Sequence, residues 1–279
     1  MSFAPGSIDL HAHSTASDGS LAPAALLAAA AHAGVRMLSI TDHDTVAAYR
    51  GGLTPPPGLA LVPGIELSTF WRRIGIHVVG LGIDIDSDAM REACARQQAA
   101  REQRARAIAA RLARQGIEDA YAGASRLADG GVIGRPHFAR LLVERGAVRT
   151  LKQAYAHHLR GAREAHGVGI WAELGEIVNW IRGAGGIAVL AHPAHYRLTG
   201  VRLGELVGEF AALGGGAIEI VSGQQLPAVT ARLAALARAH GLAGSLGSDF
   251  HHPDRPHAPL GRLPALPEDV PPVWSHWVA

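Results

Sequence analysis

The sequence is poor in cysteine, in aromatic residues and in long apolar runs. Its single cysteine, Cys94, lies in a strongly charged stretch, so no disulfide can form within the chain. Neither end shows the basic region leading into an apolar one that marks a targeting segment. The most apolar helical stretch, residues 23–33, is too short to cross a bilayer and is interrupted by His32. These absences favour a cytoplasmic protein without a membrane partner, and nothing in the sequence indicates an obligate protein partner.

Lysine is almost absent as well. The chain carries 26 lysine and arginine residues with a formal net charge of +2, and Lys152 is its only lysine. Arginine presents a planar fork that suits phosphate. A composition rich in arginine and alanine also arises from base-composition bias, however, so composition alone does not establish a phosphate-binding protein.

Short apolar runs typical of strands alternate with longer runs typical of helices. The predicted strands are residues 7–10, 36–40, 59–62, 77–80, 186–190, 217–221 and 242–246. Predicted helices cover 23–33, 203–213 and 227–240, and Gly34, Gly214 and Gly241 follow them where C-terminal caps are expected. Alternating β and α units indicate an α/β fold with a parallel sheet, either closed into a barrel or doubly wound.

Residues 88–169 interrupt this alternation. Residues 88–116 form a long, charged helix pattern, and further helical patterns cover 119–129, 136–145, 150–159 and 173–182. We therefore expect a helical insertion at 88–169 within a β/α core built from residues 1–87 and 170–279. Its arginine run is typical of a solvated helix face. The proline-rich tail, PALPEDVPPVWSHW, is expected to lie over the surface with its tryptophans as anchors.

Histidine and acidic side chains gather around the ends of the predicted strands. In α/β barrels the C-terminal ends of the strands converge on one mouth, where catalytic groups are found. The nine residues that would face this mouth are His11, His13, Asp18, His43, Glu66, His77, His192, Asp249 and His251.

So many polar groups in one pocket would be costly to bury unless a charged species neutralised them. Divalent cations do so, and with about three protein ligands for each ion this set suits two or three metals. Imidazole and carboxylate ligands without thiolate indicate manganese, zinc or iron rather than calcium.

The motifs DLHAHSTASDG, TDHDT, PGIELS, HVVGLGID, VLAHPA and GSDFHH resemble those of the polymerase and histidinol phosphatase (PHP) family. The segments RPHFARLLVERGAV, AYAHHLRG, AGGIAVLAHP and IEIVSG resemble one branch of it, the 3′,5′-nucleoside bisphosphate phosphatases, also described as 5′-to-3′ exoribonucleases. The resemblance implies a distorted TIM-like barrel of seven β/α units, (β/α)7, whose helical insertion covers the active site.

The resemblance also implies a site for three metals. Its first metal would be held by His11, His13 and Asp249. Glu66 would bridge to a second metal, held by His77 and His192. Asp18, His43 and His251 would hold the third. Manganese is the favoured ion, with zinc or iron as alternatives.

Several positions outside this ligand set depart from the branch, among them Arg163, His195 and Gln225. Arg163 stands where a lysine is usual, His195 where an arginine is usual, and Gln225 where a histidine is usual. These differences bear on substrate preference rather than on the type of reaction.

The expected reaction is hydrolysis of the 3′-phosphate of nucleoside 3′,5′-bisphosphates, with short 5′-phosphorylated RNA as a further substrate. Cations lower the pKa of bound water and offset charge on the phosphoryl oxygens. Either Asp42 or His195 would position water or protonate the leaving oxygen, and the sequence does not choose between them. The alternatives are a histidinol-phosphate phosphatase and a non-catalytic nucleic-acid-binding module.

A second substrate phosphate would need cations that are not metal ligands. The insertion offers Arg135, His137 and Arg163, with Lys152 as a fourth candidate. Pro136 suits the first turn of a helix, so Arg135 is expected at a helix N-terminus, where amide groups and the helix dipole favour an anion. The competing interpretation of Arg135 is a structural ion pair, and that of Lys152 is an ordinary surface residue.

Overall fold

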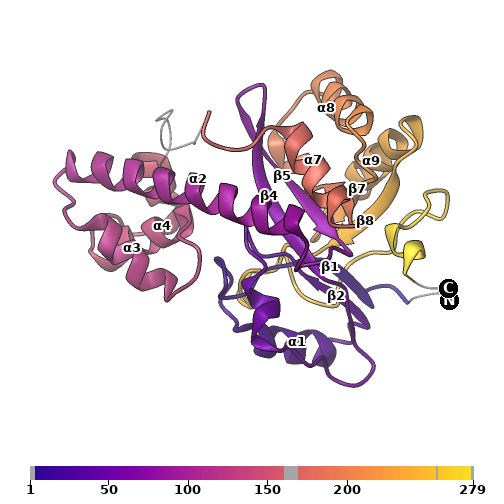
Figure 1. Cartoon of the computed structure of the whole chain (residues 1–279), viewed down its shortest axis with the longest axis horizontal. Coiled ribbons are helices and arrows are strands. Elements are labelled where there is room, and N and C mark those ends of the chain that lie inside the picture. The colour runs from indigo at the N-terminus through magenta and orange to yellow at the C-terminus, as the bar shows by residue number, and fades with distance from the viewer. Residues whose placement is uncertain (1–3, 160–168, 256, 278–279) are drawn as a thin grey trace.

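The computed structural model describes residues 4–159, 169–255 and 257–277, and their strands form two sheets (Figure 1). The first sheet is parallel, with the order β1 (Ile8–Ala12), β2 (Met37–Ile40), β3 (Ala60–Leu61). The second has the order β4 (Gly64–Trp71), β5 (Ile74–Leu81), β6 (Ile187–Leu190), β7 (Ala217–Ser222), β8 (Ala243–Gly247). The α/β fold class is confirmed.

The expectation of a wholly parallel sheet is wrong. β4, which the sequence pattern did not predict, forms an antiparallel hairpin with β5, and β5 is also antiparallel to β6. Among the described residues the sheets are connected by single bridges, in which Ala12 pairs with Phe250, just after β8, and Glu66 pairs with His43, just after β2. The sheet topology therefore does not show a closed barrel of seven β/α units.

The tip of the β4–β5 hairpin explains why the hairpin was missed. Trp71 pairs with Ile74, which leaves a two-residue loop of Arg72 and Arg73, both with positive φ (45° and 71°). Such loops usually contain glycine, asparagine or aspartate, because these residues adopt positive φ at low cost. Two arginines give no such signal.

Four helices lie beside the sheets, namely α1 (Pro23–His32), α7 (Leu174–Gly183), α8 (Gly200–Ala212) and α9 (Pro227–Ala239). The sequence pattern predicted the bounds of these helices to within a few residues. The expected caps Gly34, Gly214 and Gly241 have φ of 87°, 95° and 65°, a conformation that a side chain would strain. Short 3₁₀ turns cover Ala47–Gly51, Pro193–Tyr196 and Val273–His276.

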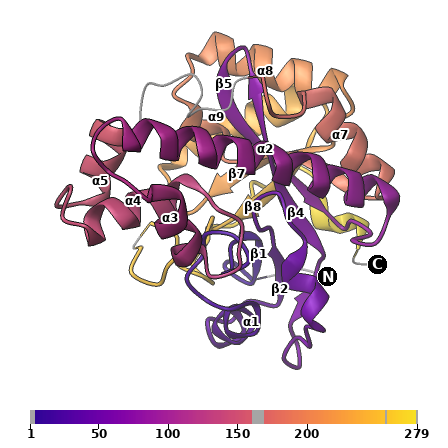
Figure 2. The ribbon, with the colours of Figure 1, turned by 60° about the vertical axis from the view of Figure 1, so that its left-hand side comes forward.

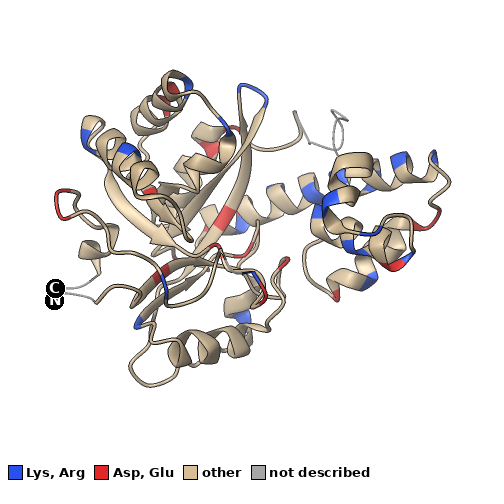
Figure 3. Cartoon of the chain, turned by 180° about the vertical axis from the view of Figure 1, so that it is seen from behind, with Lys and Arg blue, Asp and Glu red and all other residues tan. Residues whose placement is uncertain are grey.

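A second group of helices extends to one side of the sheets (Figures 1 and 2). It consists of α2 (Asp88–Ala113), α3 (Ala120–Ala128), α4 (Arg135–Glu144), α5 (Leu151–Ala154) and a π-helical turn at Tyr155–Leu159. These helices bury a hydrophobic cluster of their own, around Phe138, Leu112 and Leu142. Figure 3 shows lysine and arginine along their ribbons.

The proline-rich tail contacts the main core through its tryptophans, as predicted. Trp274 and Trp277 are partly buried against that core, although the tail also contains the short 3₁₀ turn. Within the described ranges, none of the helices combines the length and apolarity that crossing a bilayer requires.

Candidate metal centre

The predicted histidine and acidic residues come together around one buried carboxylate, that of Glu66 in β4. Glu66 Oε1 lies 2.9 Å from His77 Nδ1, 3.0 Å from His192 Nε2 and 3.4 Å from His11 Nε2. Its other oxygen, Oε2, lies 2.9 Å from His43 Nδ1 and 3.4 Å from His13 Nε2. Five imidazole rings therefore contact a single carboxylate.

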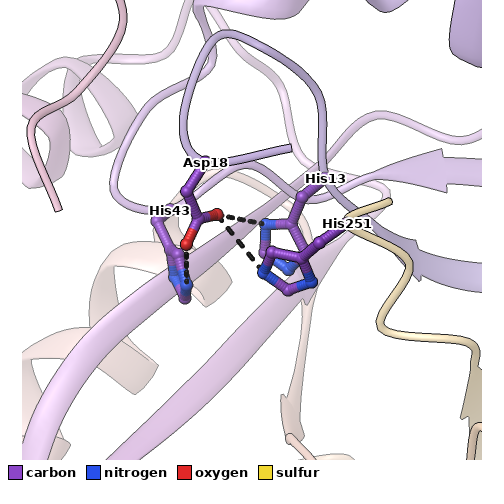
Figure 4. A group of neighbouring side chains, drawn as sticks. All are labelled: His13, Asp18, His43 and His251. Atoms are coloured by element: carbon purple, nitrogen blue, oxygen red, sulfur yellow. Dashed lines mark ion pairs between the residues drawn. The ribbon is translucent and has the colours of Figure 1, made fainter. Parts of the chain in front are cut away.

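Asp18 is the acidic centre of a second group (Figure 4). Its Oδ1 lies 3.3 Å from His251 Nε2 and 3.8 Å from His13 Nδ1, and its Oδ2 lies 3.9 Å from His43 Nε2. The β1 loop supplies Asp18, while His251 follows β8, so residues distant in the sequence meet here.

Asp249 completes the arrangement. Its Oδ1 lies 3.3 Å from His13 Nε2 and 3.5 Å from His11 Nε2. Asp249 and His192 have positive φ (56° and 27°), a backbone strain that non-glycine residues tolerate mainly at functional sites. All nine predicted residues thus fall into overlapping groups whose ligand atoms lie within 4.8 Å of one another.

The donor set suits divalent metal ions. His13 Nδ1, His43 Nδ1 and Glu66 Oε2 are buried and make no hydrogen bond among the described residues, although His43 Nδ1 and Glu66 Oε2 lie only 2.9 Å apart. Buried polar atoms in proteins nearly always have a partner, so nitrogens and a carboxylate oxygen that face one another without hydrogen bonds indicate a binding site for a cation.

Electrostatics around the cluster favour ligation. Burial, aided by the charge of His251, lowers the pKa of His13 to about 3, and burial lowers the pKa of His77 to about 4. Burial opposes ionisation of Glu66, yet His77, His43 and His11 hold the pKa of its carboxyl well below the usual range. His13 and His77 are therefore neutral beside an ionised Glu66 at neutral pH, which is the protonation that metal ligands need. Neighbouring carboxylates outweigh burial and raise the pKa of His192, and they raise the pKa of His251 to about 9, so binding of a metal at His251 would release a proton.

Glu219, in β7, was not singled out by the sequence analysis. Its buried carboxylate lies 2.6 Å from His11 Nδ1, accepts the backbone N–H of His192 at 2.6 Å and accepts the hydroxyl of Ser222 at 2.9 Å. It orients His11 so that Nε2 faces the cluster, the arrangement found behind many metal-bound histidines. Its position inside an apolar strand pattern concealed it.

The two candidates for proton transfer occupy different surroundings. Asp42 is buried, and its carboxylate accepts the backbone N–H of Ser14 at 2.8 Å and the hydroxyls of Ser14 and Ser17 at 2.5 and 2.6 Å. Those bonds fix the loop that carries Asp18. His195 is exposed and stacks on His192, with ring centroids 5.4 Å apart.

The predicted phosphate-binding residues are spread over α4 and its surroundings. Arg135 begins α4 as expected and is partly buried, without an ion pair among the described residues. His137 is buried, and its Nδ1 accepts the backbone N–H of Gly134 at 2.9 Å, so this nitrogen caps the helix. Lys152 is exposed on α5, and Arg163 lies outside the described residues.

A cavity of about 350 Å³ opens beside the Asp18 group. Asp18 and His251 form part of its wall, and α4 with Tyr155 forms another part. The remaining lining residues include Arg140, Leu151, His252, Asp254 and Arg255. Volumes of this size accommodate small ligands.

Comparison with known proteins places the fold and the site in a class. A scan against protein-family models finds no match. The structure superposes on an amidohydrolase from Chromobacterium violaceum, solved with bound sulfate and no metal, with a TM-score of 0.88 and 36% identity over 97% of this chain and 95% of that one. It shares its fold with a metal-dependent phosphoesterase from Bifidobacterium adolescentis (TM-score 0.70, 24% identity, 95% and 92% covered). The fold is therefore that of these two solved proteins, and the clustered ligands lie within it.

Sequence relatives narrow the assignment. The chain is 44% identical to the 5′-3′ exoribonuclease Rnm of Salmonella typhimurium over 96% of its own length and 93% of the relative. It is 37% identical to the 3′,5′-nucleoside bisphosphate phosphatase of C. violaceum, with 96% and 95% covered. The chain belongs to the family of these hydrolases, which confirms the resemblance drawn from its motifs.

Proposed function

We propose that this protein hydrolyses the 3′-phosphate of nucleoside 3′,5′-bisphosphates and removes nucleotides from the 5′ end of short 5′-phosphorylated RNA. The observation that carries the proposal is the contact of five imidazole rings with the Glu66 carboxylate. A carboxylate has two oxygens and can therefore serve two neighbouring cations. The names of the two relatives supply the substrate class.

The nine clustered residues would hold two or three divalent transition metals, with manganese as the first candidate and zinc or iron as the others. His11, His13 and Asp249 would bind one ion, and His77 and His192 a second, with Glu66 between them. The group in Figure 4 would bind the third.

The two sheets together would form a distorted barrel. Support comes from two bridges that connect the five-stranded sheet to the three-stranded sheet at both of its edges. Glu66 of β4 pairs with His43, and Phe250, just after β8, pairs with Ala12 of β1. The β/α core would comprise residues 1–87 and 170–279, with residues 88–169 as an insertion over the active site. The separate hydrophobic cluster of α2–α5 supports this division.

Bound divalent metals supply Lewis acidity and lower the pKa of water, so that a nucleophile is available at neutral pH. The chain's own residues would do the rest. Glu219 holds His11 in its ligand orientation, and Asp42 holds the loop of Asp18. His195, which is exposed beside His192, would donate a proton to the leaving oxygen. We prefer it to Asp42 because both carboxylate oxygens of Asp42 already accept hydrogen bonds from the loop.

The substrate would span two regions. The reacting phosphate would lie at the ligand cluster and the nucleoside in the cavity beside Asp18. The 5′-phosphate would lie near Arg135, with Arg163 and His137 as further candidates and Lys152 as a peripheral one. Remote binding energy of this kind positions the reacting group.

The test is a side-by-side assay of adenosine 3′,5′-bisphosphate, adenosine 3′-monophosphate and histidinol phosphate. We expect kcat/KM for the bisphosphate to exceed that for the 3′-monophosphate at least tenfold, because the second phosphate contributes binding energy. Equal values would remove the case for a 5′-phosphate site. Preference for histidinol phosphate would favour that phosphatase activity instead, and no phosphate release from any substrate would favour a binding module.

A further inference from the structure

Helix α2 connects the main hydrophobic core to the separate cluster of α2–α5. Its first half packs Met90 and Ala93 into the main core, whereas Ile108 and Leu112 belong to the separate cluster. The residues buried between these two halves include the polar Gln97 and Arg101. Directed hydrogen bonds, and not apolar packing alone, therefore hold the middle of α2 against the sheets.

Both polar side chains bind one carboxylate, that of Asp44. Asp44 is fully buried, and Arg101 is only 5% exposed. Arg101 Nε donates to Asp44 Oδ2 at 2.5 Å, and Gln97 Nε2 donates to Asp44 Oδ1 at 3.1 Å. Among the described residues, Arg101 is the one cation within ion-pair distance of this carboxylate. Because a buried charge without a partner is costly, each member of the pair depends on the other.

Asp44 directly follows the candidate ligand His43 in a strained turn. Its φ is 56°, a conformation that non-glycine residues adopt at a cost. Its backbone N–H donates to the carbonyl oxygen of Glu66 at 2.8 Å. Its carboxylate accepts the backbone N–H and the hydroxyl of Ser68 at 2.8 and 2.9 Å, and Ser68 pairs with His77 across the hairpin. The contacts of Asp44 therefore fix the turn of His43 against the strand of Glu66.

The loop between α3 and α4 contacts a second ligand-bearing segment, the loop of Asp18. The backbone N–H of Val132 donates to the carbonyl oxygen of Ala16 at 3.1 Å. Gly131 approaches the same loop so closely that a Cβ placed on it would lie 2.5 Å from the carbonyl oxygen of Thr15. The α2–α5 region thus contacts both the Asp18 loop and the His43 turn.

A cavity of about 360 Å³ lies between these contacts. Ala16, Thr45, Arg101 and residues 130–133 all form part of its wall. Because this space is not filled by packed side chains, the distance between the His43 turn and α2 depends on the hydrogen bonds of Arg101 and Gln97.

The two contacted segments supply one particular group of candidate ligands. Asp18 and His43 lie together in the group of Figure 4. Another group, His11 with Glu66 and His192, comes from strands of the two sheets and from the residues just after them. The α2–α5 region is therefore placed to affect the metal position at Asp18 and His43 more than the others.

We propose that Arg101 and Asp44 are positioning residues for the divalent metal ion held by Asp18 and His43, so that binding of this ion depends on the contact between α2 and the His43 turn. The inference rests on the proposed use of the cluster for metals and is independent of the substrate. A purely structural ion pair predicts a different result, because its loss would lower stability without changing the number of bound ions.

The experiment counts bound Mn²⁺ by metal analysis, after protein stripped with a chelator has been dialysed against increasing Mn²⁺ concentrations. At the concentration that just saturates the wild type, we expect Arg101→Gln to bind one ion fewer per chain. Filling that site should need about 10–100-fold more Mn²⁺, the usual effect of losing a residue that orients a ligand. Arg106→Gln removes an exposed ion pair with Glu102 further along α2 and should match the wild type.

A double variant separates positioning from the cost of an unpaired charge. Arg101→Gln leaves the Asp44 carboxylate buried and unpaired, so it should lower Tm. Adding Asp44→Asn removes that charge and should recover part of the lost Tm. The connection to α2 stays broken, so the double variant should still bind one ion fewer. Recovery of the ion together with Tm would overturn the proposal, because charge and not position would then be the cause.

Leu142→Ala is the control for general stability of the α2–α5 region. It truncates a fully buried side chain of the separate cluster and should lower Tm while the number of bound ions stays the same. Loss of one ion in this variant too would overturn the specific role of Arg101. A wild type that binds no Mn²⁺ would refute the proposed metal centre. If the wild type and Arg101→Gln fill all sites at the same Mn²⁺ concentrations, only the present inference fails.

Discussion

The chemistry of single residues in the cluster depends on partners behind them. His11 can offer Nε2 to a cation because Glu219 occupies its Nδ1 at 2.6 Å. The same carboxylate holds the backbone of His192, so one buried side chain orients two of the clustered residues. Glu219 is a positioning residue in this scheme.

Replacing Glu219 with glutamine tests this role. The amide keeps the size of the side chain but loses the charge that holds His11 in the ligand tautomer, so we expect metal affinity to fall about 10–100-fold. Titration of activity with Mn²⁺ should show the shift, and excess metal should restore most of the turnover. Unchanged metal affinity would show that Glu219 only supports the fold.

At the scale of single residues, the sequence analysis identified the candidate metal ligands but not the residues that orient them. The nine clustered residues were found because their types recur after or within successive strands, a pattern that packing alone does not produce. Glu219 lies in the pattern IEIVSG, which is typical of a buried strand. Only the tertiary arrangement distinguishes it from an ordinary strand residue.

At the scale of elements, the proposed substrate site depends most directly on α4. Its N-terminus presents Arg135, while His137 caps the helix from inside. The helix start was predicted from Pro136, since proline is favoured in the first turn. The β4–β5 hairpin was not predicted, so the sequence placed Glu66 after a strand when it lies within one.

We expect Arg135→Ala to lose about 1.5–3 kcal/mol in kcat/KM for the bisphosphate, the range for hydrogen bonds to charged groups. The loss should be much smaller for a 3′-monophosphate, which has no phosphate at that position. Arg149→Ala, an exposed arginine just before α5, is the matched control and should behave as the wild type. An equal loss with both substrates would assign Arg135 to the reacting phosphate or to the fold.

For the whole molecule, the cluster links metal content to stability. Six imidazoles and three carboxylates from both sheets meet in one place, and orphaned buried atoms remain among them. Ions that bind the folded chain and not the unfolded one stabilise it by about 2.7 kcal/mol at a hundredfold excess over Kd.

Chelation should therefore lower Tm. At about 2–4 °C for each kcal/mol in a protein of this size, complete removal of the metals is expected to lower Tm by roughly 5–10 °C for one site. Differential scanning calorimetry with and without chelator measures the change, and added Mn²⁺ should reverse it. A Tm unaffected by verified metal removal would contradict a structural contribution of the ions.

The register of the β4–β5 hairpin constrains how the gene for this protein can vary. Glu66 pairs across the hairpin with Val79 and Ser68 with His77, so Glu66 and His77 are diagonal neighbours on one face of the sheet. A codon gained or lost within either strand would turn one of the two side chains to the opposite face. Codons added at the tip, beyond Trp71 and Ile74, leave this pairing untouched. Lineages descended from a common ancestor are therefore free to diverge in length at Arg72 and Arg73, while selection fixes the number of residues on either side.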